Sequence, residues 1–240
     1  ASASLTMNNG TLNLNGNSIT LGALSGNNTG VIHNSSGTAC SLTLDLPADG
    51  TYGCKIDDGP GGMPVSLIKK GIGNVTSTGA SNFSGSVSIE GGQFIANYPN
   101  YGGAPTSSSL GNLQVADRTI TVTSPGELRL TNNNIFGNQN ANVSLLPKVL
   151  VNGTTVSSAN YNLIGDITLN ASTLSQSRSN DPANYQGYRP GDRNNRCQHY
   201  LRKRNRWEPP LGQYSLRCGG CDRGCRGGSL RFRFVDRSVR

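Results

Sequence analysis

Cysteine and histidine residues near the C-terminus have spacings that a zinc ion could use. The candidate ligands are Cys197, His199, Cys218, Cys221 and Cys225. Thiolates and imidazoles at such spacings can hold zinc in a tetrahedron. The basic stretch 202–206 beside Trp207 could equally contact phosphates and stack on a base. Against both interpretations, this segment has no recognisable strand or helix pattern, and its cysteine pairs lack the usual knuckle arrangement.

Two more cysteines and two adjacent carboxylates could also do chemistry. Cys40 and Cys54 are fourteen residues apart; they could form a disulfide in an exported protein or remain buried free thiols. Asp57 and Asp58 beside Gly59 could bind calcium, but that cation needs about six to eight oxygen ligands and no repeated acidic motif supplies them. We leave the pairing of the cysteines open and predict a solvated turn at the two aspartates.

The sequence offers no recognisable catalytic constellation. His33 and His199 are the only histidines, and no Gly-x-Ser-x-Gly motif is present. Lys69 and Lys70 precede Gly71 without the order of a phosphate-binding loop, so we expect a corner with an exposed charge pair. The other acidic residues are scattered, among them Asp45, Asp49, Asp117, Glu127 and Asp166. We predict no catalytic, cofactor-binding or metal-binding residue, and no cofactor.

The basic charge belongs to one end of the chain. Over 240 residues the formal net charge is +8, which alone would suggest a nucleic-acid or membrane partner. Residues 1–188 carry seven Lys/Arg and nine Asp/Glu, whereas residues 189–240 carry fourteen and four. Four of the six cysteines and the single tryptophan also lie in the second segment. The composition therefore places a boundary near Tyr188.

The composition of residues 189–240 is typical of a coding sequence translated out of frame. Thirteen of its fourteen basic residues are arginine, and CGN arginine codons crowd together with Cys, Gly and Pro codons when a GC-rich gene is read in the wrong frame. A one-base shift can yield Thr/Val/Ser/Ala strands with Gly-Asn turns. Our hypothesis is a frameshift product without a packed core; the alternatives are a disordered basic arm and a metal or nucleic-acid site.

Residues 1–188 favour an all-β structure of very short strands. Charged residues make up 14% of the chain against about 25% in soluble domains, which argues against a helical bundle or coiled coil. Apolar residues alternate over spans such as 12–14, 42–44, 87–89 and 120–122, so they share one face of a strand. Gly- and Asn-rich turns separate these spans. No run approaches the ~18 apolar residues of a transmembrane helix.

Strands this short must be covered by their neighbours. Related units recur at Gly10–Leu14, Gly37–Leu44 and Gly91–Ile95. A strand–corner–strand rhythm of roughly 20–25 residues per repeat is typical of a β-solenoid, in which each coil covers the open edge of the next. The competing architecture is a β-sandwich, which also uses short strands. We predict the solenoid.

The stretch Val65–Phe94 resembles the autotransporter-associated β-strand repeat, also called the passenger-associated transport repeat. That family's pattern is Leu-x-Lys-x-Gly-x-Gly-x-Leu, a Leu-x-Gly strand end, aromatic-x-Gly, and an apolar strand with Gly-x-Leu. The matching positions are Leu67, Lys69, Gly71, Gly73, Val75, Gly79, Phe83, Gly85, Val87, Ile89, Gly92 and Phe94. Ser77 stands where the family usually carries Leu, so we expect poorer packing there.

The resemblance implies a right-handed parallel β-helix, here a β-solenoid over residues 1–188 with a poorly structured tail over 189–240. It also implies export and display outside a bacterium by a C-terminal outer-membrane barrel. On that expectation the chain is a fragment whose signal peptide has already been removed. Its localisation would be extracellular or at the bacterial cell surface.

We therefore predict a non-enzymatic structural or adhesin-like segment of an autotransporter-type passenger. Its partners would be its own stacked coils, neighbouring passenger sequence, or a host or environmental glycan or protein surface, with no nucleic acid and no membrane insertion. The alternative is a carbohydrate-active β-helix, similar to pectate lyase or a phage tailspike, with charged groups converging within about 5–10 Å. The candidates for that convergence are Asp45, Asp57, Asp58, Glu90, Asp117 and Arg118. A third, weaker option is nucleic-acid binding through residues 189–240.

Overall fold

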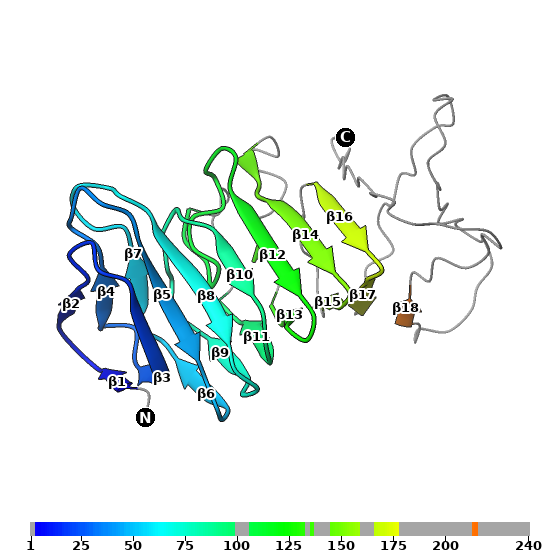
Figure 1. Cartoon of the computed structure of the whole chain (residues 1–240), viewed down its shortest axis with the longest axis horizontal. Helices are drawn as coiled ribbons and strands as arrows, with labels where there is room; N and C mark the ends of the chain where they lie inside the picture. The colour runs from blue at the N-terminus through cyan, green and yellow to red at the C-terminus, as the bar shows by residue number, and fades with distance from the viewer. Residues whose placement is uncertain are drawn as a thin grey trace, which may run out of the picture.

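A computed structural model describes residues 3–98, 106–132, 135–136, 145–158, 166–177 and 213–215. These residues form short strands in three sheets and contain no α-helix (Figure 1). The all-β prediction is confirmed. No helix that could span a membrane occurs in the described part of the chain.

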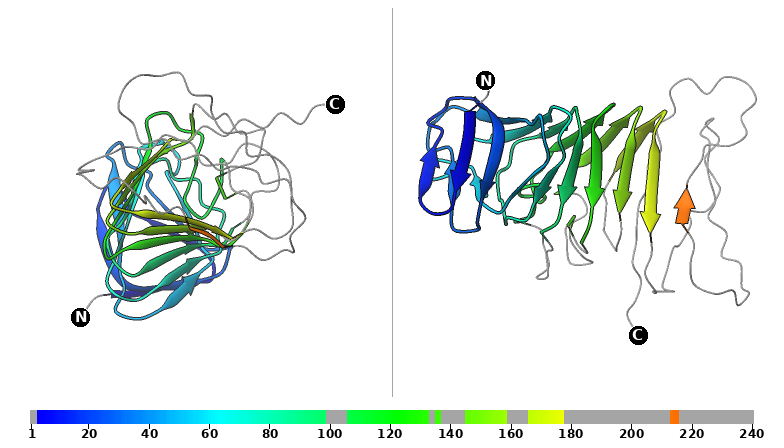
Figure 2. Two further views of the ribbon diagram at one scale, coloured as in Figure 1. Left: turned by 90° about the vertical axis from the view of Figure 1, so that its right-hand side faces the viewer. Right: turned by 90° about the horizontal axis from the view of Figure 1, so that it is seen from below.

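The largest sheet has eight parallel strands. In spatial order they are β1 (Ala3–Met7), β3 (Ile19–Gly26), β5 (Cys40–Asp45), β8 (Val65–Lys70), β10 (Val87–Ile89), β12 (Thr119–Thr123), β14 (Lys148–Asn152) and β16 (Ile167–Asn170). The spatial order follows the chain order, so each new pass of the chain adds one strand beside the last. Figures 1 and 2 show these strands side by side along the long axis of the molecule.

Two further sheets contain the other strands: the three-stranded sheet serves the early passes and the seven-stranded sheet serves the later ones. The seven-stranded sheet contains β6 (Gly50–Tyr52), β9 (Val75–Ser77), β11 (Gln93–Ala96), β13 (Glu127–Leu130), β15 (Thr155–Ser158), β17 (Thr173–Ser177) and β18 (Gln213–Ser215). The three-stranded sheet, called the third sheet below, contains β2 (Thr11–Asn13), β4 (Val31–His33) and β7 (Lys55–Asp57). All pairs are parallel except β17 with β18.

Strand β18 belongs to the tail that was predicted to lack a strand pattern. It pairs antiparallel with β17, with Gln176 opposite Tyr214, so that prediction is wrong at residues 213–215. An open sheet edge offers unpaired backbone N–H and C=O groups to any extended segment, whatever its composition. The other residues of 189–240 lie outside the described residues, as do the five candidate zinc ligands.

The number of residues per pass varies more than the sequence rhythm predicted. Leu67 pairs with Val87, twenty residues later, but Val87 pairs with Ile120, thirty-three residues later. The extra residues follow β11 and β13, at 97–118 and 131–147. Because the strands on either side of these insertions keep their register, the insertions lengthen one side of the pass and leave the two large sheets unchanged.

Inward-facing side chains stack in rows along the axis. One row in the eight-stranded sheet is Leu42, Leu67, Val87, Ile120, Val149 and Ile167. All six side chains are buried. Neighbouring strands lie about 4.8 Å apart, so each side chain covers the apolar surface of the one before it. The alternation seen in the sequence is therefore the source of the core.

Lys69 interrupts a neighbouring row and is fully buried between Leu44 and Ile89. Burial lowers its pKa, and the carboxylates of Asp45 and Asp49 partly oppose that effect. A buried ammonium group is tolerated when it is hydrogen-bonded. Its Nζ donates to the carbonyl oxygens of Lys70 (2.5 Å), Gly71 (3.2 Å) and Gly91 (2.9 Å).

The prediction that Lys69 and Lys70 form an exposed charge pair is therefore wrong for Lys69. The side chain lies in the core because its ammonium group satisfies corner carbonyls from two successive passes, including that of Gly91. Lys70 does project outward, and its Nζ lies 3.5 Å from a carboxylate oxygen of Glu90. Lys69, the lysine of the repeat pattern, therefore has a structural role.

Ser77 lies in a row between Tyr52 and Ala96, and all three side chains are fully buried. Burial raises the pKa of the Tyr52 phenol, and Ser77 partly counters this effect. The two hydroxyls nevertheless do not meet hydrogen-bond geometry with each other or with another described group. What the structure shows at Ser77 is a fully buried side chain and two buried hydroxyls without a well-aligned partner, which costs stability; poorer packing there stays a prediction.

Glycines at the corners lie directly on the backbone of the preceding pass. A Cβ on Gly85 would lie 2.2 Å from the carbonyl oxygen of Val65, and one on Gly73 would lie 2.2 Å from that of Ala48. Neither glycine has a positive φ. These positions therefore require glycine because of close stacking, not because of backbone conformation.

We expect Gly85→Ala to lower the free energy of unfolding by about 2–3 kcal/mol, because the added methyl group must push two passes apart. Gly37→Ala is the matched control. Its Cβ would have no atom within 4 Å and its φ is also not positive, so we expect a change below about 1 kcal/mol. Urea unfolding followed by far-UV circular dichroism measures both. Equal effects of the two substitutions would contradict close stacking at Gly85.

Candidate functional site

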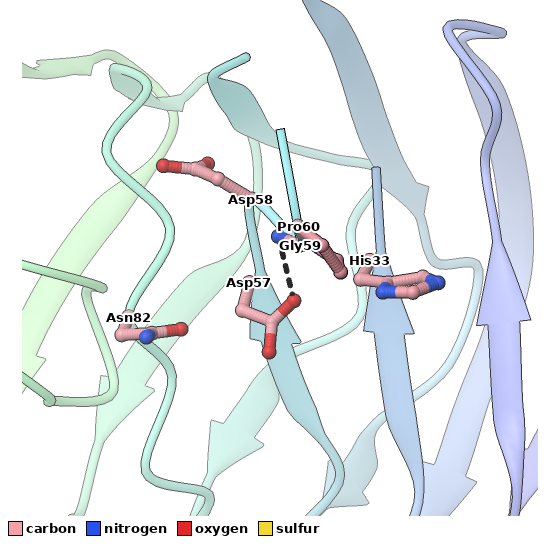
Figure 3. Close-up of a pocket in the computed structure, with 6 residues that line it drawn as sticks. All are labelled: His33, Asp57, Asp58, Gly59, Pro60 and Asn82. Carbon is pink, nitrogen blue, oxygen red and sulfur yellow. Dashed lines mark hydrogen bonds between the residues drawn. The ribbon is translucent and has the colours of Figure 1, made fainter. Parts of the chain in front are cut away.

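A polar hollow lies on the outer face of the third sheet. It has a volume of about 270 Å³ and is lined by His33, Asp57, Asp58, Gly59, Pro60 and Asn82 (Figure 3). Two strands and two turns from successive passes contribute these residues. In this hollow an imidazole, carboxylates and a side-chain amide lie close together, which makes it the candidate site.

The register of the strands brings three of these residues into line. His33 of β4 is paired with Asp57 of β7. The N–H of Asn82 donates to the carbonyl of Ile56 at 3.0 Å, which continues the parallel pattern and places Asn82 beside Asp57. Because Ile32 and Ile56 point inward and are fully buried, the residues that follow them point outward.

Asp57 is held in place by local contacts. Its Oδ1 accepts a hydrogen bond of 2.9 Å from the N–H of Gly59 (Figure 3), and its Oδ2 lies 3.0 Å from Nζ of Lys55. Gly59 has a φ of 68°, and a Cβ there would lie 2.7 Å from the carbonyl oxygen of Asn34 and 3.0 Å from Nδ1 of His33. Glycine is therefore needed for the turn to pass beside the His33 ring.

Asp58 points away from Asp57 in Figure 3 and joins two passes. Its Oδ1 accepts hydrogen bonds from the N–H groups of Val65 (2.8 Å) and Ser84 (3.1 Å), and its Oδ2 accepts from Ser84 at 2.9 Å. Both aspartates are half-buried. The predicted solvated turn is wrong for Asp58, because backbone donors of neighbouring segments use its carboxylate; the carboxylate of Asp57 has its backbone donor in its own turn.

Most of the other acidic candidates have partners of their own, and none of them lines the hollow. Asp49 accepts from the N–H of Asn74 at 2.7 Å, Glu90 is paired with Lys70, and Asp117 lies 3.7 Å from Nζ of Lys148. The remaining ones are Asp45, which is exposed at the end of β5, Glu127, which accepts from Gln93, and Asp166, which is half-buried. No group of three or more His, Cys, Asp or Glu residues that could hold a metal ion occurs in the described part of the chain.

Arg118 was a candidate for a charged groove, but it is a buried clamp. Its guanidinium carbon lies 5.0 Å from the centroid of the Phe83 ring. Burial lowers its pKa to about 9, and the carboxylate of Asp58 partly counters this effect, so the group is still a cation at neutral pH. Its donors bind three carbonyl oxygens, those of Gly85 (2.6 Å), Asn112 (2.8 Å) and Leu110. The clamp fastens part of the insertion after β11 to the preceding pass.

Cys40 and Cys54 are buried free thiols. Of the two possibilities left open by the sequence, the structure has the unpaired one. Burial raises the pKa of Cys54 to about 11, and burial and then Asp58 raise that of Cys40. Both groups are therefore protonated at neutral pH and behave as small apolar side chains.

Sequence reasoning missed Asn82 and the role of Arg118. Asn82 follows no motif, and only the stacking of a third pass beside Asp57 gives it a place in the hollow. The proximity of Arg118 to Phe83 depends on an insertion of the chain that has no periodic pattern. A signal was available only for Asp57 and Asp58, as adjacent acids before a glycine.

Compared with protein-family models, curated proteins and solved structures, the chain matches none.

We expect Asp58→Ala to lower the free energy of unfolding by about 2–3 kcal/mol, because backbone N–H groups of Val65 and Ser84 lose a charged acceptor. Asp45→Ala is the control, since Asp45 is an exposed aspartate at a strand end and its loss should change stability by less than about 0.5 kcal/mol. Urea unfolding provides the comparison. A cost for Asp58→Ala no larger than that for Asp45→Ala would show that Asp58 does not join the passes.

Proposed function

We propose that residues 3–177 are a right-handed β-solenoid segment of an exported, autotransporter-type passenger. The observation that carries this proposal is the stacking of the Val65–Phe94 repeat. Its four strands β8, β9, β10 and β11 pair in parallel with the preceding and following passes in both large sheets. Crossovers between parallel strands of one sheet are right-handed in about 98% of cases, which supports the handedness.

We propose a structural or adhesin-like role outside a bacterial cell for this segment. The described carboxylates mostly have hydrogen-bond or ion-pair partners that serve the fold, as at Asp58 and Asp49. Ile72 is the only large hydrophobic residue exposed in the described part. A regular stack of strands with a polar surface suits a stalk or spacer. Because most of its charged groups are used by the fold, few remain to bind a ligand, and binding would be confined to a local site.

The alternative is a carbohydrate-active solenoid. Glycoside hydrolysis uses two carboxyl groups that face the scissile bond from opposite sides. Asp57 and Asp58 diverge in Figure 3, and Asp58 is occupied by backbone donors. This arrangement favours binding of a ligand over cleavage of one.

The export proposal is tested by placing the full chain between a secretory signal peptide and the translocator domain of an autotransporter in a Gram-negative host. We expect the chain on the cell surface, where protease added to intact cells can reach it. Because the stacked strands bury their backbone, the strands from β1 to β17 should resist digestion. Gly37→Ala should behave like the parent chain, and Gly85→Ala should be more readily degraded.

Retention of a folded, protease-resistant chain in the periplasm would contradict the export proposal. Release of reducing sugar from neutral or acidic polysaccharides by the purified chain, lost in Asp57→Asn, would favour the carbohydrate-active alternative over the non-enzymatic one.

A further inference from the structure

The hollow of the third sheet has the dimensions of a small ligand site. Its volume of about 270 Å³ lies just below the range of about 300–1,000 Å³ for sites that take drug-sized ligands. It lies on the outer face of the sheet, where His33 and Asp57 line it (Figure 3), and it is open to solvent. A single ring on a larger molecule would fit such a space, whereas a long cofactor would not.

The polar groups around the hollow include both donors and acceptors. Within the described residues, no hydrogen bond uses the ring nitrogens of His33, and a neutral imidazole has one donor and one acceptor. The side-chain oxygen of Asn82 is buried without a hydrogen-bond partner, although its amide borders the hollow. The last torsion of Asn is broad, so a small rotation turns this amide toward a ligand.

The charge at the hollow argues for a neutral ligand. Lys55 offsets the charge of Asp57 at 3.0 Å, and Asp58 is used by backbone N–H groups. An anionic ligand would meet two carboxylates. A cationic ligand would have to compete with Lys55, and it would leave the donors of His33 and Asn82 without acceptors.

A metal ion is a poorer match than a hydroxyl group. His33, Asp57 and Asp58 line the hollow, but Asp58 is already used by backbone N–H groups, and no group of three ligands that could hold a metal ion occurs among the described residues. A hydroxyl group both donates and accepts, so adjacent hydroxyls can use the carboxylate, imidazole and amide together.

We propose that this hollow binds one neutral, hydroxyl-rich sugar ring of a surface glycan, with His33, Asp57 and Asn82 as its hydrogen-bonding residues. This inference rests on the proposed adhesin-like function and specifies its ligand class. With few contacts and an open surface, a single site has a dissociation constant on the order of 1 mM.

The test uses the full chain labelled with 15N only at histidine. The chain contains two histidines, so the spectrum holds signals from His33 and His199, and His33→Phe assigns them. Methyl glycosides of glucose, galactose and mannose are titrated to about 100 mM, some hundredfold above the expected dissociation constant. We expect at least one to shift the His33 signals saturably while those of His199 stay unchanged.

Asn82→Ala should weaken this binding at least fivefold. Asn28→Ala is the matched control, because Asn28 is an exposed asparagine in a turn outside the hollow, and it should bind like the parent chain. Unfolding midpoints in urea verify that both variants fold. A test that needs no variant compares glucuronate with methyl glucoside on the parent chain, and glucuronate should bind at least fivefold more weakly.

Three results would overturn the proposal. The first is the absence of a saturable shift of the His33 signals with every neutral glycoside. The second is tighter binding of glucuronate than of methyl glucoside. The third is a shift of the His33 signals with micromolar zinc but with no sugar. Each leaves the export experiment untouched, so failure of the glycan site and failure of the passenger function are distinguishable.

Discussion

The close contact of one pass of the chain with the backbone of the next is the constraint on which the whole structure depends. At Gly85 and Gly73 a single methyl group would lie 2.2 Å from a carbonyl oxygen of the pass before. Two passes can approach this closely only where glycine forms the corner. The same approach brings the ammonium group of Lys69 within hydrogen-bond distance of the Gly91 carbonyl. This buried charge therefore links two successive passes.

This spacing determines where polar side chains gather. In-register stacking converts positions far apart in the sequence into neighbours about 4.8 Å apart, and so His33, Asp57 and Asn82 form one outward row. The insertions after β11 and β13 lengthen later passes outside the two large sheets. Arg118 fastens one of them to Phe83 and Gly85. The large sheets therefore act as a rigid frame, and the variable chemistry lies at the side of each pass.

The sequence predicts the fold better than it predicts the site. Alternation at Leu42–Leu44 and Val87–Ile89 is a local signal, and the strands form there. The environment of Lys69 could not be predicted, because its carbonyl partners include one from the following pass. Asp58 could not be placed for the same reason, since the N–H of Ser84 that binds its carboxylate lies twenty-six residues later. Long-range register, which no local pattern encodes, decides both cases.

The parallel register between passes underlies every contact described above, and a disulfide between outward-facing neighbours can measure it. Ser88 is paired with Thr121 across the pass with the long insertion. Cysteines at these two positions would have Cα atoms about 4.8 Å apart, within disulfide range. We predict that Ser88→Cys with Thr121→Cys forms this bridge on mild oxidation, as identified by peptide mapping. Ser88→Cys with Thr123→Cys, about 8 Å apart on the diagonal, should not. Bridging of the diagonal pair in preference to the aligned pair would contradict the register and the stacked fold built on it.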